Sequence, residues 1–226
     1  MNKELRKLLT TTILVVVAIV IDVLITVIPG LNLSMPMGGK LFGISLIPLV
    51  LIGLLFGLKY GLLGGFIYAL YNFSFDYLIY LSTLQATLES WTGTPWSFWH
   101  IMALILFDYI IPFMAFGLSG LFKKNDLKLK NIVLSVTLVS VVRLISSSIA
   151  GVLLWGSSIQ YAASAGDNNI ATQIFSFVNN NLVLYSLIYN IIYILTTYIA
   201  SLIIFSSIKN SLIIIYDKAN QNTIDQ

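Results

Sequence analysis

Long apolar runs constrain this sequence more than any other feature. The segment from Leu8 to Pro29 contains one ionisable residue, Asp22, and comparable runs follow along most of the chain. A helix of roughly 20 apolar residues crosses the hydrocarbon of a bilayer. Backbone N–H and C=O groups cannot stay unpaired in lipid, so continuous runs of this length must form helices. The sequence therefore predicts an all-α membrane protein.

We expect six transmembrane helices in a single domain that covers residues 1–226. Only 9% of the residues are charged, whereas a soluble domain uses about a quarter. This composition excludes a soluble enzyme, a nucleic-acid binder and a disordered protein, and it indicates a multi-pass protein of the cell membrane. The predicted spans are approximately 8–29, 41–57, 60–82, 99–122, 132–156 and 182–208.

The basic residues predict the orientation of these spans. If the chain crosses the membrane six times, ten basic residues fall on one side of it and only Lys40 falls on the other, while Arg143 lies within a span. Cytoplasmic loops carry the excess of Lys and Arg in membrane proteins. We therefore expect both termini in the cytoplasm. The ten basic residues on that side are Lys3, Arg6, Lys7, Lys59, Lys123, Lys124, Lys128, Lys130, Lys209 and Lys218.

The sequence lacks the groups that most enzymes use. It contains no cysteine and one histidine, His100, which excludes thiolate chemistry and a multi-histidine metal centre. The phosphate-binding pattern GxxxxGK[ST] is absent, as are H-E-x-x-H and G-x-S-x-G. We expect no catalytic activity, no metal and no cofactor.

Ionisable residues inside the predicted spans are the better indicators of function, because they are costly in hydrocarbon. Asp22 and Asp76 lie in the outer parts of their helices, so for each a role as a residue at the membrane boundary explains its presence as well as a functional role does. Asp108 lies about ten residues inside its span, or ~15 Å. Pro112 follows four positions later, and its ring clashes with the Asp108 carbonyl in a regular helix. The helix should therefore be distorted at the buried carboxylate.

Polar and aromatic residues of the last two spans reach a similar depth. Ser147 and Trp155 lie on one stripe of the fifth span, while Tyr185 and Asn190 lie on neighbouring faces of the sixth. Together with Asp108 they suit a flat cationic ligand, because an indole face attracts a cation and a carboxylate neutralises it. A polar packing seam, in which Asp108 pairs with Arg143, explains the same residues equally well.

Two further patterns have structural explanations that we prefer to functional ones. Glycines recur every four residues from Gly53 to Gly65, which predicts close helix packing. Trp91, Trp96 and Trp99 flank an outer connection, where tryptophan usually marks the membrane interface. A role for Trp91 or Trp96 in covering a ligand is the less favoured alternative.

Several segments, in the right order on the right spans, resemble the thiamine-binding S component of energy-coupling factor (ECF) transporters. Each segment is short, but together they cover all spans except the first. They are Met37–Pro48 with Gly57–Gly65, Asp108–Gly120, Ile149–Gly156 and Tyr185–Asn190.

The resemblance implies a six-helix membrane protein that captures thiamine from outside the cell and has no motor of its own. Asp108 would lie beside the cationic thiazolium ring, and Trp155 would stack on the ligand. Tyr109, Tyr185 and Asn190 would form hydrogen bonds to it. Uptake would require a partner module of two ATPases and a scaffold transmembrane protein.

The sequence departs from the family pattern at three places. Ser147 stands where the family commonly has His, and the first outer loop, residues 29–40, contains no aromatic residue. Ala18 is the only alanine where the first span usually carries an Ala-xxx-Ala docking face. The first two differences favour weaker binding or a related ligand, such as a thiamine precursor, thiamine phosphate or another flat vitamin. A membrane assembly protein that binds no vitamin is the alternative from another class.

Overall fold

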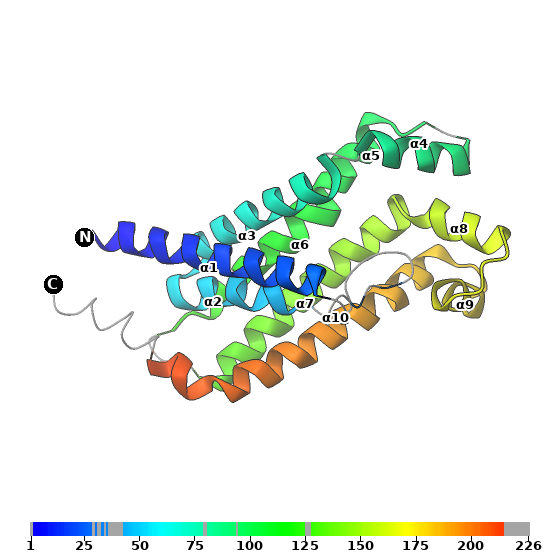
Figure 1. Ribbon diagram of the computed structural model, residues 1–226. Coiled ribbons are helices and arrows are strands. Elements are labelled where there is room, and N and C mark those ends of the chain that lie inside the picture. The colour runs from blue at the N-terminus through cyan, green and yellow to red at the C-terminus, as the bar shows by residue number, and fades with distance from the viewer. Residues whose placement is uncertain are drawn as a thin grey trace.

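The structure is a computed structural model that describes residues 2–28, 30, 33, 35, 43–78, 81–93, 95–124 and 128–214. These residues form helices joined by short links, with no β-strand among them (Figure 1). The elements are α1 (Lys3–Val27), η1 (Ile44–Leu46), α2 (Ile47–Phe56), α3 (Leu58–Phe73), η2 (Ser74–Leu78), α4 (Leu81–Thr92), α5 (Phe98–Ala103), η3 (Leu104–Ile110), α6 (Ile111–Met114), η4 (Ala115–Phe122), α7 (Leu129–Leu153), α8 (Gly156–Ser164), α9 (Ile170–Phe177) and α10 (Leu182–Ser207).

The helices confirm an all-helical membrane protein but support fewer spans than the sequence predicts. Within these described residues, four helices are long and apolar enough to cross a bilayer: Lys3–Val27, Phe98–Phe122, Leu129–Leu153 and Leu182–Ser207. Leu58–Leu78 is long and apolar enough only when it is combined with α4. The two helices are inclined by 61° to each other, so together they would make one bent fifth span. Ile44–Phe56 is apolar but extends only ~20 Å, short of the ~30 Å hydrocarbon core. The count of six therefore stays a prediction.

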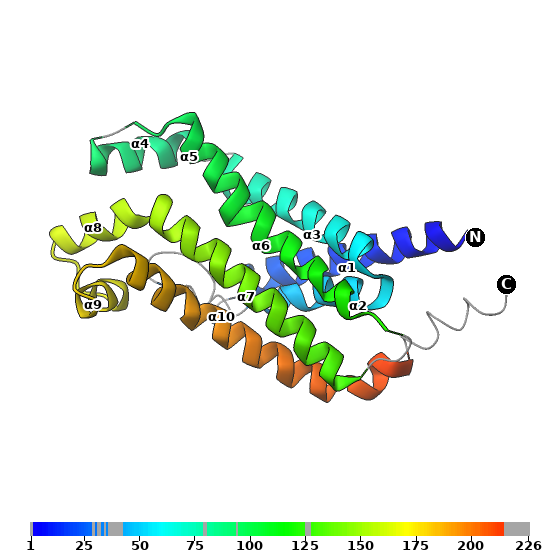
Figure 2. The same cartoon turned by 180° about the vertical axis from the view of Figure 1, so that it is seen from behind.

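The bundle has two different ends. Figures 1 and 2 both place the start of α1, the α2–α3 turn and the end of α10 at one end. The short helices α4, α5, α8 and α9 gather at the opposite end. The connections 83–98 and 157–181, which the sequence predicts on the outer side, thus contain much of this helical cap. The predicted first outer loop, residues 29–40, lies outside the described residues except at 30, 33 and 35.

Basic residues from three segments meet at the end that bears the start of α1. The amines of Lys7 and Lys59 lie 5.6 and 5.9 Å from the centre of the Tyr60 ring. Burial lowers the pKa of the Lys123 ammonium, and the charges of Lys7 and Lys3 lower it further. These lysines therefore share one end of the molecule, as the sequence predicts. Whether that end is cytoplasmic stays a prediction.

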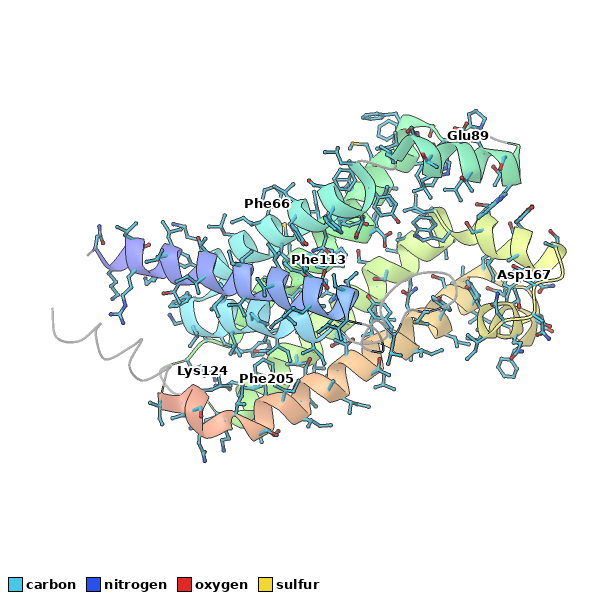
Figure 3. The ribbon with its side chains drawn as sticks, in the orientation of Figure 1. Phe66, Glu89, Phe113, Lys124, Asp167 and Phe205 are labelled. Carbon is cyan, nitrogen blue, oxygen red and sulfur yellow. The ribbon has the colours of Figure 1, made fainter. Side chains whose placement is uncertain are left out.

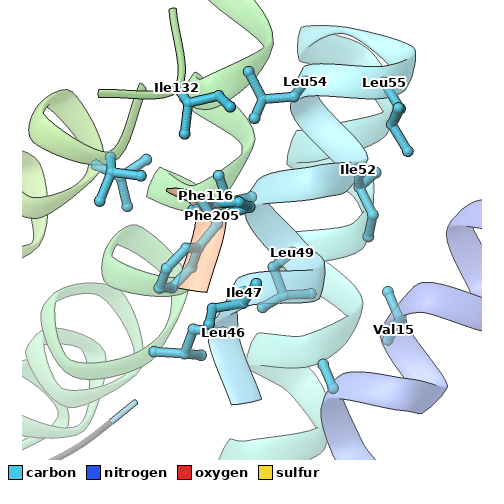
Figure 4. Close-up of a cluster of buried hydrophobic side chains, with 14 of the residues drawn as sticks. Val15, Leu46, Ile47, Leu49, Ile52, Leu54, Leu55, Phe116, Ile132 and Phe205 are labelled. Carbon is cyan, nitrogen blue, oxygen red and sulfur yellow. The ribbon is translucent and has the colours of Figure 1, made fainter. Parts of the chain in front are cut away.

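The main hydrophobic core is centred on α2. Its side chains are almost all buried, because α1, α3, η4 and α7 surround the short helix. Leu49, Ile52 and Leu54 are fully buried, and Figure 4 shows them beside Phe116 of η4 and Phe205 of α10. An element too short to span the bilayer therefore forms the interior of the bundle.

Glycines bring η4 and α6 against α2 and α3. A Cβ atom at Gly53 would lie 2.0 Å from Ser119 Oγ, and one at Gly61 would lie 2.7 Å from the Gly117 Cα. At Gly65 it would lie 2.5 Å from the Phe113 carbonyl oxygen. The predicted close packing is thus confirmed at these three positions. Gly57, with a φ of +90°, instead forms the turn between α2 and α3.

Replacing Gly65 with alanine should destabilise the bundle, because the new methyl group meets backbone that cannot rotate away. Overpacking of this kind costs about 1–3 kcal/mol. Gly64→Ala is the matched control, because its Cβ meets side-chain atoms and no backbone; the nearest is the end of the Ile52 side chain, Cδ1, at 2.8 Å. Thermal unfolding in detergent should show a lower Tm for Gly65→Ala and a nearly unchanged one for Gly64→Ala. Equal Tm values would contradict the packing argument.

Candidate functional site

Two π-helical segments lie at the centre of the candidate site. η2 contains Phe75, Asp76 and Tyr77, and η3 contains the same tripeptide at 107–109. η2 extends α3, while η3 interrupts the helix that runs from Phe98 to Phe122. Single π-helical turns are rare and occur frequently at functional sites. The predicted distortion at Asp108 is therefore present, as a widened helical turn just before Pro112.

Asp108 and Trp155 are in direct contact. The Trp155 indole Nε1–H donates a hydrogen bond to the Asp108 Oδ2 at 3.3 Å. Trp155 follows the last turn of α7 and caps the start of α8, so its ring is placed where the long helix gives way to the outer cap. The predicted pair of a carboxylate and an indole thus forms one unit.

The Trp155 ring is flanked by two aromatic rings from other elements. Its centre lies 6.4 Å from that of Tyr77, with 33° between the planes, and 6.4 Å from that of Trp96, with 53° between them. Trp96 also stacks on His100 at 5.7 Å. The carboxylate of Asp108 therefore lies at the edge of a group of aromatic rings.

Tyr109 connects the two π-helical segments. Its hydroxyl donates a long hydrogen bond, 3.4 Å, to the Asp76 Oδ2. Its ring meets those of Tyr77 and Phe73 edge-on, at 5.3 and 5.4 Å. Tyr109 is buried, whereas Asp76 is exposed. The two Phe-Asp-Tyr tripeptides therefore interlock.

The remaining predicted site residues lie elsewhere on α7 and α10. Asn190 Nδ2–H donates to the Ser147 carbonyl oxygen at 3.3 Å and to the Ser186 carbonyl oxygen at 2.8 Å. Tyr185 is buried between Phe175 of α9, 5.5 Å away, and a neighbouring tyrosine on α10. The structure thus joins Asp108, Tyr109 and Trp155 in one cluster. It joins Ser147 and Asn190 in a second contact and places Tyr185 beside the outer helix α9.

Arg143 does not pair with Asp108, so the alternative of an Asp108–Arg143 seam is wrong. The Arg143 side chain is only 7% exposed, and its Nη2–H donates to the Tyr193 hydroxyl at 3.2 Å. The guanidinium also lies over the rings of Phe116, at 4.8 Å, and Tyr193, at 5.4 Å. Aromatic faces and one hydroxyl compensate this buried charge.

The outer helices are tied together above this group. Trp91 of α4 stacks on Tyr161 of α8, with ring centres 5.0 Å apart and planes within 6°. The Trp96 backbone N–H donates to the Glu89 carboxylate at 2.8 Å, and Figure 3 shows Glu89 at this end of the bundle. Leu88, 1% exposed, anchors α4. Trp91 and Trp96 therefore make internal contacts, and Trp96 reaches Trp155, whereas Trp99 is 76% exposed.

Sequence reasoning missed Tyr77 and Tyr193 as members of these clusters and left Asp76 undecided. The repeated tripeptide Phe-Asp-Tyr, at 75–77 and 107–109, is a sequence signal that could have identified Tyr77 and Asp76. Tyr193 had no such signal. Among the described residues, no group of three His, Cys, Asp or Glu side chains is arranged to hold a metal ion.

Comparison with known proteins gives two matches. A family model described as "Thiamine transporter protein" matches residues 90–216, which include all six predicted site residues. The chain is also 28% identical, over 203 residues, to the thiamine transporter ThiT of Bacillus subtilis (strain 168). That match covers 90% of this chain and 90% of the relative. Asp76 and Tyr77 lie outside the range of the family model.

These matches confirm the resemblance inferred from the short motifs. They confirm a multi-pass membrane transporter and the prediction that the chain is not an enzyme. They also argue against a membrane assembly protein, an alternative that already lost its Asp108–Arg143 pair. The roles of individual residues remain predictions.

Tyr193→Phe should destabilise the protein, because it leaves the buried Arg143 guanidinium without its hydroxyl partner. An unsatisfied buried group of this kind costs about 1–3 kcal/mol. Adding Arg143→Met to Tyr193→Phe should recover much of that loss, since an apolar side chain of similar size has no unmet hydrogen bond. Thermal unfolding of the two single variants and the double variant measures the coupling. Strictly additive effects would show that the contact is not energetically significant.

Proposed function

The chain belongs to the thiamine transporter protein family, and from this premise we propose that it captures thiamine for an ECF-type importer. It would act as the substrate-binding S component, with thiamine bound in a pocket open to the outside of the cell. We propose a single membrane domain of six spans, with α2 and the helix Leu58–Leu78 completing the set. Both termini would be cytoplasmic, so the cap of α4, α8 and α9 would face outward.

The contact between Asp108 and Trp155 is the observation that supports this proposal best. Thiamine carries a permanently cationic thiazolium ring, which a carboxylate neutralises and an indole face attracts. In the described part of the chain, Asp108 forms no ion pair with Lys or Arg. A cationic ligand would supply the charge that this carboxylate lacks.

The spacing of the aromatic rings is close to that needed for a flat ligand. Tyr77 and Trp155 are tilted by 33° with centres 6.4 Å apart. A planar ring inserted between two others needs roughly 7 Å, or two carbon contacts of about 3.5 Å. If the two rings became parallel and their centres moved apart by less than about 1 Å, a thiazolium or pyrimidine ring would fit between them. Trp96 would cover the Trp155 ring from the cap side.

We propose hydrogen-bonding roles for the other predicted site residues. Tyr109, the residue after Asp108, has a hydroxyl that donates to Asp76 in the structure and would turn to the ligand. Ser147 and Asn190 lie on the facing helices α7 and α10, two turns below Trp155. The Ser147 hydroxyl contacts the Tyr193 hydroxyl at 3.3 Å and the Asn190 amide donates to the Ser147 carbonyl oxygen, so both groups would exchange these contacts for ones to the ligand. Tyr185 would take part from the side of α9, next to Phe175. Because Ser147 is small, the pocket would be roomier here than with histidine, which suits a related flat ligand as well.

Uptake would depend on a partner module of two ATPases and a scaffold transmembrane protein, because the chain has no phosphate-binding loop. The partner would not dock on an Ala-xxx-Ala face of α1 at Ala18. Ala18 is fully buried and Asp22, one turn further along, is 9% exposed and accepts a hydrogen bond from Ser45 at 3.3 Å. This side of α1 therefore faces the bundle.

Asp108→Asn should weaken thiamine binding while leaving the fold intact. Removing one charge from a buried charge pair costs several kcal/mol, about 2–5. Isothermal titration of detergent-purified protein with thiamine measures the loss, and Asp167→Asn, an exposed acid on the cap, is the control. A panel of thiamine, thiamine phosphate and other flat vitamins identifies the ligand. Unchanged affinity in Asp108→Asn would remove this carboxylate from the site.

Transport should require the partner module. We expect the purified chain in proteoliposomes to bind thiamine without accumulating it, because nothing in the sequence couples to ATP. Reconstitution with the two ATPases and the scaffold protein should give ATP-dependent accumulation of labelled thiamine inside the vesicles. Accumulation by the chain alone would contradict the ECF-type mechanism.

A further inference from the structure

We propose that Asp76 is a second ligand-determining carboxylate, which draws the cation to the site while Asp108 holds it there. This inference rests on the proposed function, because it divides the recognition of the same cationic ligand between two residues. Neither the family match, which begins at residue 90, nor the motif resemblance includes Asp76.

The two Phe-Asp-Tyr tripeptides place both carboxylates around the same aromatic pair. Tyr109 follows Asp108 directly, and its hydroxyl donates to Asp76 at 3.4 Å. Tyr77 follows Asp76 directly, and its ring lies 6.4 Å from that of Trp155, which donates to Asp108. The rings of Tyr77 and Tyr109 meet edge-on at 5.3 Å. Each acid is thus tied to the aromatic residues that accompany the other.

The two carboxylates differ in accessibility. Asp76 is exposed, at the outward end of the helix that begins at Leu58, whereas Asp108 is half-buried and bonded to an indole. An exposed charge at the rim of a binding site changes mainly the association rate and its salt dependence. A desolvated, hydrogen-bonded charge changes mainly the dissociation rate. The geometry therefore assigns capture to Asp76 and retention to Asp108.

The expected size of the capture effect follows from screening. Charges act over about 30 Å at 0.01 M salt but only about 3 Å at 1 M. A field that steers a ligand into a cleft raises association rates by about tenfold or more. For the single charge of Asp76 we expect about threefold to tenfold at low salt and less than about twofold at 1 M.

Stopped-flow measurement of tryptophan quenching by thiamine tests this division. The variants are Asp76→Asn, Asp76→Glu, Asp108→Asn and the control Asp167→Asn, an exposed acid elsewhere on the cap. Each is mixed with thiamine at about 10 mM and about 1 M salt. We expect Asp76→Asn to lose association rate at low salt, with little change in dissociation rate. Asp76→Glu should restore the rate because it restores the charge, and Asp108→Asn should mainly speed dissociation.

The outcomes separate this inference from the proposed function. If the unmodified protein binds thiamine but Asp76→Asn matches Asp167→Asn in rate and salt dependence, the capture role is wrong and the proposed function stands. A salt-independent loss in Asp76→Asn that Asp76→Glu does not restore would show that Asp76 only supports Tyr109, which also overturns the capture role. If the unmodified protein does not bind thiamine while remaining folded, the proposed function itself fails.

Discussion

A carboxylate without a basic partner, held against an indole inside an apolar bundle, is the interaction on which the rest of this site depends. Moving a charge out of water is costly unless it is paired and hydrogen-bonded. In the described residues Asp108 has the Trp155 indole N–H as a donor and no Lys or Arg within ion-pair distance. The fold therefore places a carboxyl group that has no basic partner at a defined position beside an indole.

The chain builds this arrangement by disturbing its own helices. Pro112 removes a backbone donor and prevents a regular turn, and the preceding residues widen into the π-helix of η3. Widening turns the Asp108 side chain toward the end of α7, where Trp155 leaves the helix and begins α8. Glycine contacts lower in the bundle compensate for the irregular segment, because they bring η4 and α6 into direct backbone contact with α2 and α3.

Hydropathy was enough to predict the helical membrane fold, and basic residues were enough to predict which segments share one end. Helical spacing predicted that Asp108 and Trp155 lie at a similar depth, but their direct hydrogen bond was not predicted, because Asp108 lies in a π-helical turn. The positions of Tyr77 and Trp96 were not predicted either, because they depend on π-helical turns and on the packing of α4 and α8 across the outer end. A run of apolar residues also cannot reveal that α2, at the centre of the core, is too short to span the bilayer alone.

The separation of Asp108 from Arg143 has a consequence for the ligand. Residue 143 lies three turns below Trp155 on α7, ~18 Å away by helical rise, and its charge rests on the rings of Phe116 and Tyr193. Had the two opposite charges met, each would have neutralised the other and the site would be indifferent to a cation. In the structure each has other partners, the Trp155 indole for Asp108 and the Tyr193 hydroxyl for Arg143. If Asp108 binds the cation as proposed, the Arg143 guanidinium, which is held on its own aromatic partners, does not compete with the ligand for this carboxylate.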